Sequence, residues 1–371
     1  MLVPMLGLLV LAKPPVKPEP CMAMKPEPCL SACEKGDEKA CTDLAILVED
    51  GLLPPQYHER LFKAVEGACD ERPGRRCFVT GMLRVWGVGT PKDAARAAQD
   101  LSHACDAGVP MACANLALRY LRGEGVEKDP VLARKLASAA CEQNYEACIN
   151  LAHMIGGGIG GMNDPKAGKA LLEKTCAAYV PACARLARVL VSETWLARDE
   201  KRALEVARSG CDRGGGGSCE FLANVYLGAF PAMRDDRAAV PLLEKACALD
   251  SGLSCHNLAV LYTEGRGVKA SAQKAAPLAE RGCLLGEQRA CANFALMKLD
   301  GRGTRKDVQG GRDLLERSCD AGARLSCHVL GLALAGGRGV KRDKAAAIKL
   351  FKRACAMGHD PACVDERKLD R

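Results

Sequence analysis

Twenty-two cysteines are the residues of this 371-residue chain whose type and spacing could most directly do chemistry. Taken in order they form eleven successive pairs, nine spaced by eight residues and two, Cys141/Cys148 and Cys176/Cys183, by seven. A structural zinc site, a dithiol redox centre or a covalent haem is signalled by C-x-x-C, which occurs nowhere in the chain. We therefore expect a local disulfide within each pair, and disulfides persist in oxidising compartments.

The predicted disulfides within the repeated region are Cys33–Cys41, Cys69–Cys77, Cys105–Cys113, Cys141–Cys148, Cys176–Cys183, Cys211–Cys219, Cys247–Cys255, Cys283–Cys291, Cys319–Cys327 and Cys355–Cys363. Whether Cys21 and Cys29 pair with each other is left open.

Ser271 and Lys274 are the second candidate for chemistry. An active-serine lactam hydrolase needs a Ser with a Lys one helical turn later, which activates the hydroxyl. The string Ser271-Ala-Gln-Lys274 has this spacing, but neither Ser-Asp-Asn nor Lys-Thr-Gly occurs to complete the set. Other repeats carry a helix-capping Asp at the position of Ser271, so we interpret Ser271 as an N-cap and assign no catalytic residue.

The histidines suggest no metal centre. They are scattered and include no His-x-His pair, so we predict no metal and no cofactor. His256 and His328 share one repeat position, directly after a cysteine, and a repeated position more often faces a neighbouring repeat than a ligand. The six histidines are His58, His103, His153, His256, His328 and His359.

A period of 35 or 36 residues, which starts at Cys33, defines the elements that carry these residues. A fixed period in this range indicates a repeat architecture. One repeat reads Cys113, Leu116, Ala117, Tyr120, Gly123, Gly125, Val126 and Asp129, and the repeats at Cys255 and Cys327 keep the pattern closely. The apolar spacing predicts a helix A, the Gly-x-Gly a helix stop, and the Asp or Ser the N-cap of a helix B that ends at the next cysteine.

We count nine such helix pairs, with helix A beginning near Cys41, Cys77, Cys113, Cys148, Cys183, Cys219, Cys255, Cys291 and Cys327. The fifth and sixth lose the Gly-x-Gly but keep a cap at Asp199 and Asp235. Only 4% of the residues are aromatic, so Ala, Leu and Gly must make the helix contacts. The predicted fold is all-α.

This pattern, with cysteines eight apart between repeats, resembles the Sel-one-like repeat (SLR) family, specifically its cysteine-rich secreted Hcp branch. The likeness covers about residues 33 to 365. The resemblance implies a right-handed alpha/alpha superhelix, or solenoid, of disulfide-bridged helical hairpins with a concave groove, related to tetratricopeptide arrays. Such repeats usually act as adaptors for proteins. Some Hcp-branch members bind penicillin derivatives and are assigned as beta-lactamase-like, but the family offers no agreed catalytic motif.

The N-terminal region predicts export. Residues 1–12 hold an apolar stretch of signal-peptide core length but lack a basic segment, so we interpret them as an atypical signal peptide. Residues 13–32 are a Pro-rich tether that contains the string Lys-Pro-Glu-Pro-Cys twice, and residues 33–371 are the solenoid with a C-terminal cap. Past the N-terminus no apolar window is long enough to span a membrane.

The net charge of +8 is unevenly distributed. Residues 298–371 hold 17 Lys and Arg against 10 Asp and Glu. This end could dock an acidic partner or an anionic envelope surface, although a solvated helix face explains the charge as well. Nucleic acid is not expected, because the basic residues are not interleaved with stacking aromatics.

We therefore expect a periplasmic or secreted, non-catalytic adaptor that binds a protein or cell-envelope component through its concave groove. The alternative is a beta-lactamase-like hydrolase, or a protein that binds penicillin or peptidoglycan fragments. Specificity should come from charged positions that vary between repeats: Arg119, Arg122, Arg185, Arg188, Lys344 and Lys349.

Overall fold

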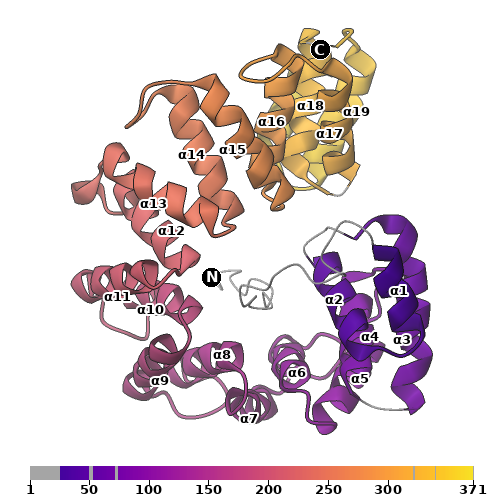
Figure 1. The fold of residues 1–371 in the computed structure, drawn as a ribbon, viewed down its shortest axis with the longest axis vertical. Helices are drawn as coiled ribbons and strands as arrows, with labels where there is room; N and C mark the ends of the chain where they lie inside the picture. The colour runs from indigo at the N-terminus through magenta and orange to yellow at the C-terminus, as the bar shows by residue number, and fades with distance from the viewer. Residues whose placement is uncertain (1–25, 50–52, 72–73, 321, 339, 371) are drawn as a thin grey trace. The chain divides into compact units, whose positions relative to one another are not determined.

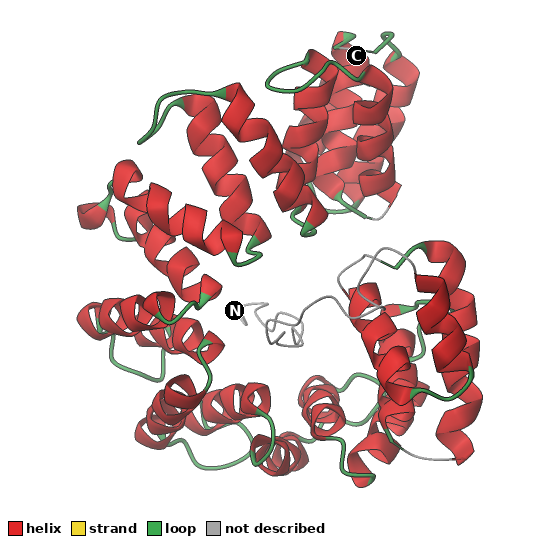
Figure 2. Cartoon of the chain, viewed as in Figure 1, coloured by secondary structure: helices red, strands yellow, loops and turns green. Residues whose placement is uncertain are grey.

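The computed structural model describes residues 26–49, 53–71, 74–320, 322–338 and 340–370. Within these ranges every regular element is a helix and no strand occurs (Figure 2). The predicted all-α repeat fold is thus confirmed. No helix in the described ranges is both long and apolar enough to cross a membrane.

The helices are α1 (Pro26–Glu34), α2 (Glu38–Glu49), α3 (His58–Glu71), α4 (Arg75–Trp86), α5 (Ala94–Asp106), α6 (Pro110–Arg122), α7 (Pro130–Cys141), α8 (Tyr145–Gly156), α9 (Pro165–Ala178), α10 (Pro181–Ser192), α11 (Glu200–Asp212), α12 (Gly216–Asn224), α13 (Asp236–Ala248), α14 (Gly252–Glu264), α15 (Ala272–Leu284), α16 (Gln288–Asp300), α17 (Val308–Asp320), α18 (Arg324–Gly336), α19 (Lys344–Ala356) and α20 (Asp360–Asp370).

The chain divides into two compact units, residues 1–199 (unit 1) and 200–371 (unit 2). The even-numbered helices α2 to α18 are the predicted A helices, and the odd-numbered helices α3 to α19 are the B helices (Figure 1). Inside each unit an A helix packs on its B helix, and neighbouring A helices such as α6 and α8, or α14 and α16, also touch. Stability in such an array comes from contacts between neighbours.

Each hairpin turn is built from capping groups. Helix α6 ends at Gly123, whose φ of 71° is left-handed, and α7 begins after Asp129, whose carboxylate accepts the backbone N–H groups of Val131 and Leu132. The left-handed conformation suits glycine, and a capping Asp typically contributes about 1 kcal/mol. The helix stop predicted at Gly-x-Gly and the N-cap predicted at Asp are therefore both present in this turn.

The second glycine of the turn packs directly against the backbone of the preceding repeat. Gly267 and Gly303 have φ values near +70°, and a Cβ atom on either would lie within 2.4 Å of a backbone carbonyl oxygen, that of Asp236 or Ala272. These carbonyls belong to the first residues of the preceding B helix. Only glycine allows the two backbones to approach so closely.

Small residues make the helix contacts. Ala133, Ala239, Ala275 and Ala347 of the B helices are fully buried. A Cβ on Gly331 of α18 would lie 2.5 Å from the ring of Phe351, which is 1% exposed on α19. Ala and Gly thus allow the close helix packing that the low aromatic content predicts.

The sixth repeat departs from the pattern where its Gly-x-Gly is missing. Helix α12 opens into a π-helical turn, Val225–Ala229, in which Gly228 has a φ of 121°, followed by a 3₁₀ turn at Pro231–Met233. Asp235 still caps the next helix by accepting the N–H groups of Arg237 and Ala238. The cap alone is therefore enough to start α13.

The predicted Pro-rich tether extends too far. Its last residues are helical, because α1 begins at Pro26. Pro26 and Pro28 lie in the first turn, where a missing backbone N–H costs nothing. Cys29, Leu30 and Cys33 are buried, and α1 packs on α2 and α3. The signal peptide, Cys21 and the rest of the tether lie outside the described residues.

Candidate functional site

Disulfides hold the turns between repeats. Ten of them join the end of one B helix, or α1, to the start of the following helix, with Cα–Cα distances between 4.4 and 4.8 Å. These are the ten pairs predicted from the spacing. No free thiol remains among the described residues, so the cysteines serve structure rather than nucleophilic chemistry.

Ser271 caps α15. Its hydroxyl accepts the backbone N–H of Lys274 at 3.3 Å, while the Lys274 ammonium lies over the ring of Tyr262, 5.3 Å from its centroid. A Ser–Lys dyad requires the amine within hydrogen-bond reach of the hydroxyl. In the structure the two side chains serve different purposes, one a cap and the other a cation–π contact.

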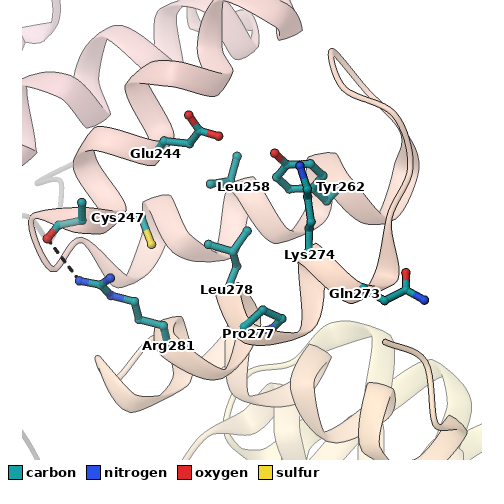
Figure 3. Close-up of a pocket in the computed structure, with 10 residues that line it drawn as sticks. Glu244, Cys247, Leu258, Tyr262, Gln273, Lys274, Pro277, Leu278 and Arg281 are labelled. Atoms are coloured by element: carbon teal, nitrogen blue, oxygen red, sulfur yellow. Dashed lines mark hydrogen bonds between the residues drawn. The ribbon is translucent and has the colours of Figure 1, made fainter. Parts of the chain in front are cut away.

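Lys274 lines a pocket of about 380 Å³ in unit 2 (Figure 3). Helices α13 and α15 form its walls, and Leu258 and Tyr262 of α14 form its floor. Leu278 and Pro277 add apolar surface from α15. No local sequence pattern signals this pocket, because its walls belong to two different repeats.

The two histidines at the shared repeat position face neighbouring elements, as predicted. His328 is 8% exposed, and its Nε2 lies 3.0 Å from Asp365 of α20 while its Nδ1 lies 3.0 Å from Nε2 of His359. His256 is equally buried, but its Nδ1 has no hydrogen-bond partner among the described residues. Burial lowers the pKa of His256, and the charge of Glu287 partly opposes this. No group of three or more metal-ligating side chains occurs in the described part of the chain.

A polar and aromatic cluster lies on α8, on α10 and on the segments just before and after α10 in unit 1. The rings of Tyr145 and Tyr179 stack with centroids 5.5 Å apart, and the Tyr179 hydroxyl donates to Glu146 at 2.7 Å. Burial raises the pKa of Glu146, which the Tyr179 hydrogen bond and the nearby Arg185 partly offset. Burial, followed by the Glu146 contact, raises the pKa of Tyr179.

Trp195 lies at the other end of this cluster. We call it the α8–α10 cluster, and its members are Glu146, His153, Tyr179, Arg185, Glu193 and Trp195. Its ring rests on Gly156 of α8, where a Cβ would come within 2.4 Å, and meets His153 edge-on at 6.1 Å. The Trp195 Nε1 is buried without a partner in the described chain. In the sequence, the only indication of this cluster is that Glu193-Thr-Trp195 replaces the usual Gly-x-Gly.

Arg185 is the cation of the α8–α10 cluster. Burial lowers the pKa of its guanidinium, while Glu193 and Glu146 raise it by charge. Its guanidinium makes no hydrogen bond to any other described residue. A half-buried Arg with unused donors suits a carboxylate from outside.

The six charged positions expected to set specificity lie on helices of both kinds. Arg119, Arg122, Arg185 and Arg188 lie on the A helices α6 and α10. Arg119 is largely buried and pairs with Glu124. Lys344 and Lys349 lie on α19, a B helix. The repeat pattern accounts for this placement, because residues that follow the N-cap Asp343 belong to helix B.

Much of the basic C-terminal region is paired internally. Arg338 and Arg302 both contact Asp300, Arg353 contacts Asp320, and Lys298 contacts Asp307 at 2.9 Å. Such exposed pairs contribute little energy, but they occupy charges that an acidic partner would need.

The chain belongs to the Sel1 repeat family. The Sel1 repeat matches residues 110–145, 146–179, 218–251, 252–287, 288–322 and 325–359, which together exceed half of the chain. No curated protein is matched by sequence.

Two solved structures with TM-scores above 0.5 show the same fold, and a third is a weaker match. A Sel1 repeat protein from Oxalobacter formigenes is 19% identical with a TM-score of 0.53, over 97% of this chain and 99% of that chain. The protective antigen c5321 of uropathogenic Escherichia coli, which displays an SLR fold, is 21% identical with a TM-score of 0.52, over 92% of this chain and 74% of that chain. Cysteine rich protein B (HcpB) of Helicobacter pylori is 23% identical with a TM-score of 0.22, over 44% of this chain and 91% of that chain.

Proposed function

We propose that this protein is an extracytoplasmic interaction scaffold that binds a protein or cell-envelope partner through the exposed surface of its A helices. Sel1 repeat proteins generally serve as protein-interaction scaffolds. Ten disulfides support a periplasmic or secreted location, because such bonds are rare where thiols are kept reduced. Residues 1–12 as a signal peptide and a tether before α1 fit the same proposal.

The chemistry of the A-helix surface changes from repeat to repeat, which supports recognition of a specific partner. The second and fifth residues after the A-helix cysteine are Arg185 and Arg188 on α10 but Val329 and Leu332 on α18. Leu332 is 45% exposed. A surface with repeated geometry and varied side chains can bind an extended partner specifically, as the binding surfaces of repeat solenoids do.

The unused donors of Arg185 carry the proposal most directly. Its guanidinium is half-buried and interacts by charge with Glu146, Glu193 and His153, so a partner carboxylate would find a positioned fork of N–H groups. Arg is one of the residue types enriched among the hot spots of protein interfaces.

Binding to an envelope fraction tests this role. We expect oxidised protein to retain one specific component, and Arg185→Gln to reduce its retention about tenfold or more. Lys135→Gln on the B helix α7 is the matched control, since it removes one exposed positive charge from the same unit. Equal retention by the two variants would contradict the A-helix surface as the binding site.

Export is tested separately. Residues 1–32 fused to an alkaline phosphatase that is active only after disulfide formation should produce activity, and deletion of residues 1–12 should abolish it. Activity that survives the deletion would exclude residues 1–12 as the signal.

The hydrolase alternative has its own test. Purified protein should turn over a chromogenic cephalosporin no faster than Ser271→Ala, because the Ser271 hydroxyl is used as a helix cap. Appreciable turnover that Ser271→Ala abolishes would instead make Ser271 a nucleophile.

A further inference from the structure

The pocket of unit 2 is a groove between two successive B helices, on the side of α14 that packs against α13 and α15. Leu258 is 2% exposed and Tyr262 9% exposed, so both are already held in place by the core. Leu278 faces Leu258 across the pocket (Figure 3). The floor is thus a preformed apolar surface, which is what a binding site needs to hold an apolar side chain.

The two cations of the pocket differ in how they are used. Arg281 donates to the carbonyl oxygen of Ala248 and to Asp250, both at 3.2 Å. Among the described residues no carboxylate pairs with Lys274, whose ammonium rests above the Tyr262 ring. Lys274 is therefore the cation that remains available to a carboxylate bound over the apolar floor, while Glu244 of α13 places one negative charge in the pocket lining.

A proline supplies the third feature. Pro277 lies inside α15 and has no N–H to donate to the carbonyl of Gln273, its partner four residues earlier. Both residues line the pocket. The carbonyl of Gln273, the residue before Lys274, thus lacks its usual helical N–H donor.

We propose that this pocket binds the C-terminal end of a peptide whose last side chain is apolar. The side chain would occupy the floor of Leu258, Tyr262 and Leu278, the α-carboxylate would pair with Lys274, and the last peptide N–H would donate to the Gln273 carbonyl. At about 380 Å³ the pocket is near the lower end of ligand sites and holds one or two residues.

This site is independent of the proposed function, because it lies between B helices and not on the exposed A-helix surface. Fluorescence anisotropy of the oxidised full chain with a labelled peptide ending in Ala-Leu and a free carboxylate tests it. We expect saturable binding that weakens about tenfold or more when the peptide is amidated at its C-terminus, because a charge-assisted hydrogen bond is lost.

Variants then assign the contact. Lys274→Gln should weaken the free acid as much as amidation does, and the variant should no longer distinguish acid from amide. Lys245→Gln, on α13 outside the pocket lining, is the matched control and should bind as the unmodified protein does. A peptide ending in Ser should bind more weakly than the Leu peptide.

Three results would overturn the proposal: no saturation by the Ala-Leu peptide, equal binding of acid and amide, or equal effects of the two Lys variants. Far-ultraviolet circular dichroism of each variant shows whether it is folded. Since the A-helix variant Arg185→Gln should not change peptide affinity, failure here leaves the envelope-binding test untouched.

Discussion

Gly125 lies directly against the backbone of Ala94: a Cβ on Gly125 would stand 1.9 Å from the Ala94 carbonyl oxygen. The contact joins the turn after α6 to the first residue of α5, the B helix of the preceding repeat. The same relationship links Gly303 to Ala272. Repeats are thus held together by backbone contact as well as by side chains and disulfides.

Gly125→Ala should therefore destabilise unit 1 by about 3 kcal/mol or more, because it combines a left-handed φ of 78° with a clash against backbone. Gly108→Ala is the control: its φ is 80°, but a Cβ there meets nothing within 4 Å, so only about 1–2 kcal/mol is expected. Urea unfolding followed by circular dichroism measures both. Equal losses would show that the contact with Ala94 adds nothing.

Buried hydroxyl groups beside the disulfides offer a stabilising change. Ser218 and Ser326 are fully buried, and their hydroxyls have no hydrogen-bond partner among the described residues. Ser326→Ala should leave stability unchanged or raise it by about 1 kcal/mol, because an unsatisfied polar group is removed. Ser254 occupies the same repeat position but bonds to the Ser251 hydroxyl at 2.9 Å, so Ser254→Ala should destabilise. Thermal melts that rank the two variants in the opposite order would contradict this.

Burial of His256 predicts a loss of stability in mild acid. Its pKa is lowered in the folded protein, so below the usual value of 6.5 the unfolded chain takes up the proton first. The free energy of unfolding should therefore fall as the pH drops from 6.5, by up to about 1.4 kcal/mol per pH unit from this group. His256→Gln should flatten the dependence measured by urea unfolding between pH 7 and 5.

His103→Gln is the control for that measurement, because His103 is exposed on α5. It should leave the pH dependence unchanged. Since burial also lowers the pKa of His153 and His359, part of the dependence should persist in His256→Gln. An unchanged slope in His256→Gln would mean that His256 is not buried in its neutral form.

Removal of one disulfide should act locally. The double change Cys247→Ser with Cys255→Ser opens a bridge of sequence separation 8 and should cost about 2–3 kcal/mol. Because each repeat contacts only its neighbours, amide hydrogen exchange should accelerate in α13 and α14 and stay unchanged in α18 and α19. Acceleration throughout unit 2 would show that it unfolds as one cooperative body. Peptide mapping of the non-reduced protein should find only pairs of sequential neighbours.

The fold could be predicted from local patterns because its signals involve residues close together in the chain. The Cys spacing, the Gly-x-Gly stop and the Asp cap act over fewer than ten residues. Asp129 and Asp343, for example, accept hydrogen bonds from the first backbone N–H groups of their own helices. The tether boundary was wrong since burial of Cys29 and Leu30, and not composition, decides whether α1 is a helix. For Trp195 the sequence showed only that the Gly-x-Gly motif is missing from its turn, and not which residues its ring contacts.

The sequence alone thus determines the helix order, the capped turns and the disulfide pairs, because each depends on residues close together in the chain. Tertiary structure decides which variable side chains meet: Tyr179 with Glu146 across 33 residues, Trp195 with Gly156, and Leu278 with Leu258 over the pocket. These contacts join different repeats or different helices, and no local signal encodes them. They depend on how far each helix is rotated and shifted against its neighbour, which packing across the whole array sets.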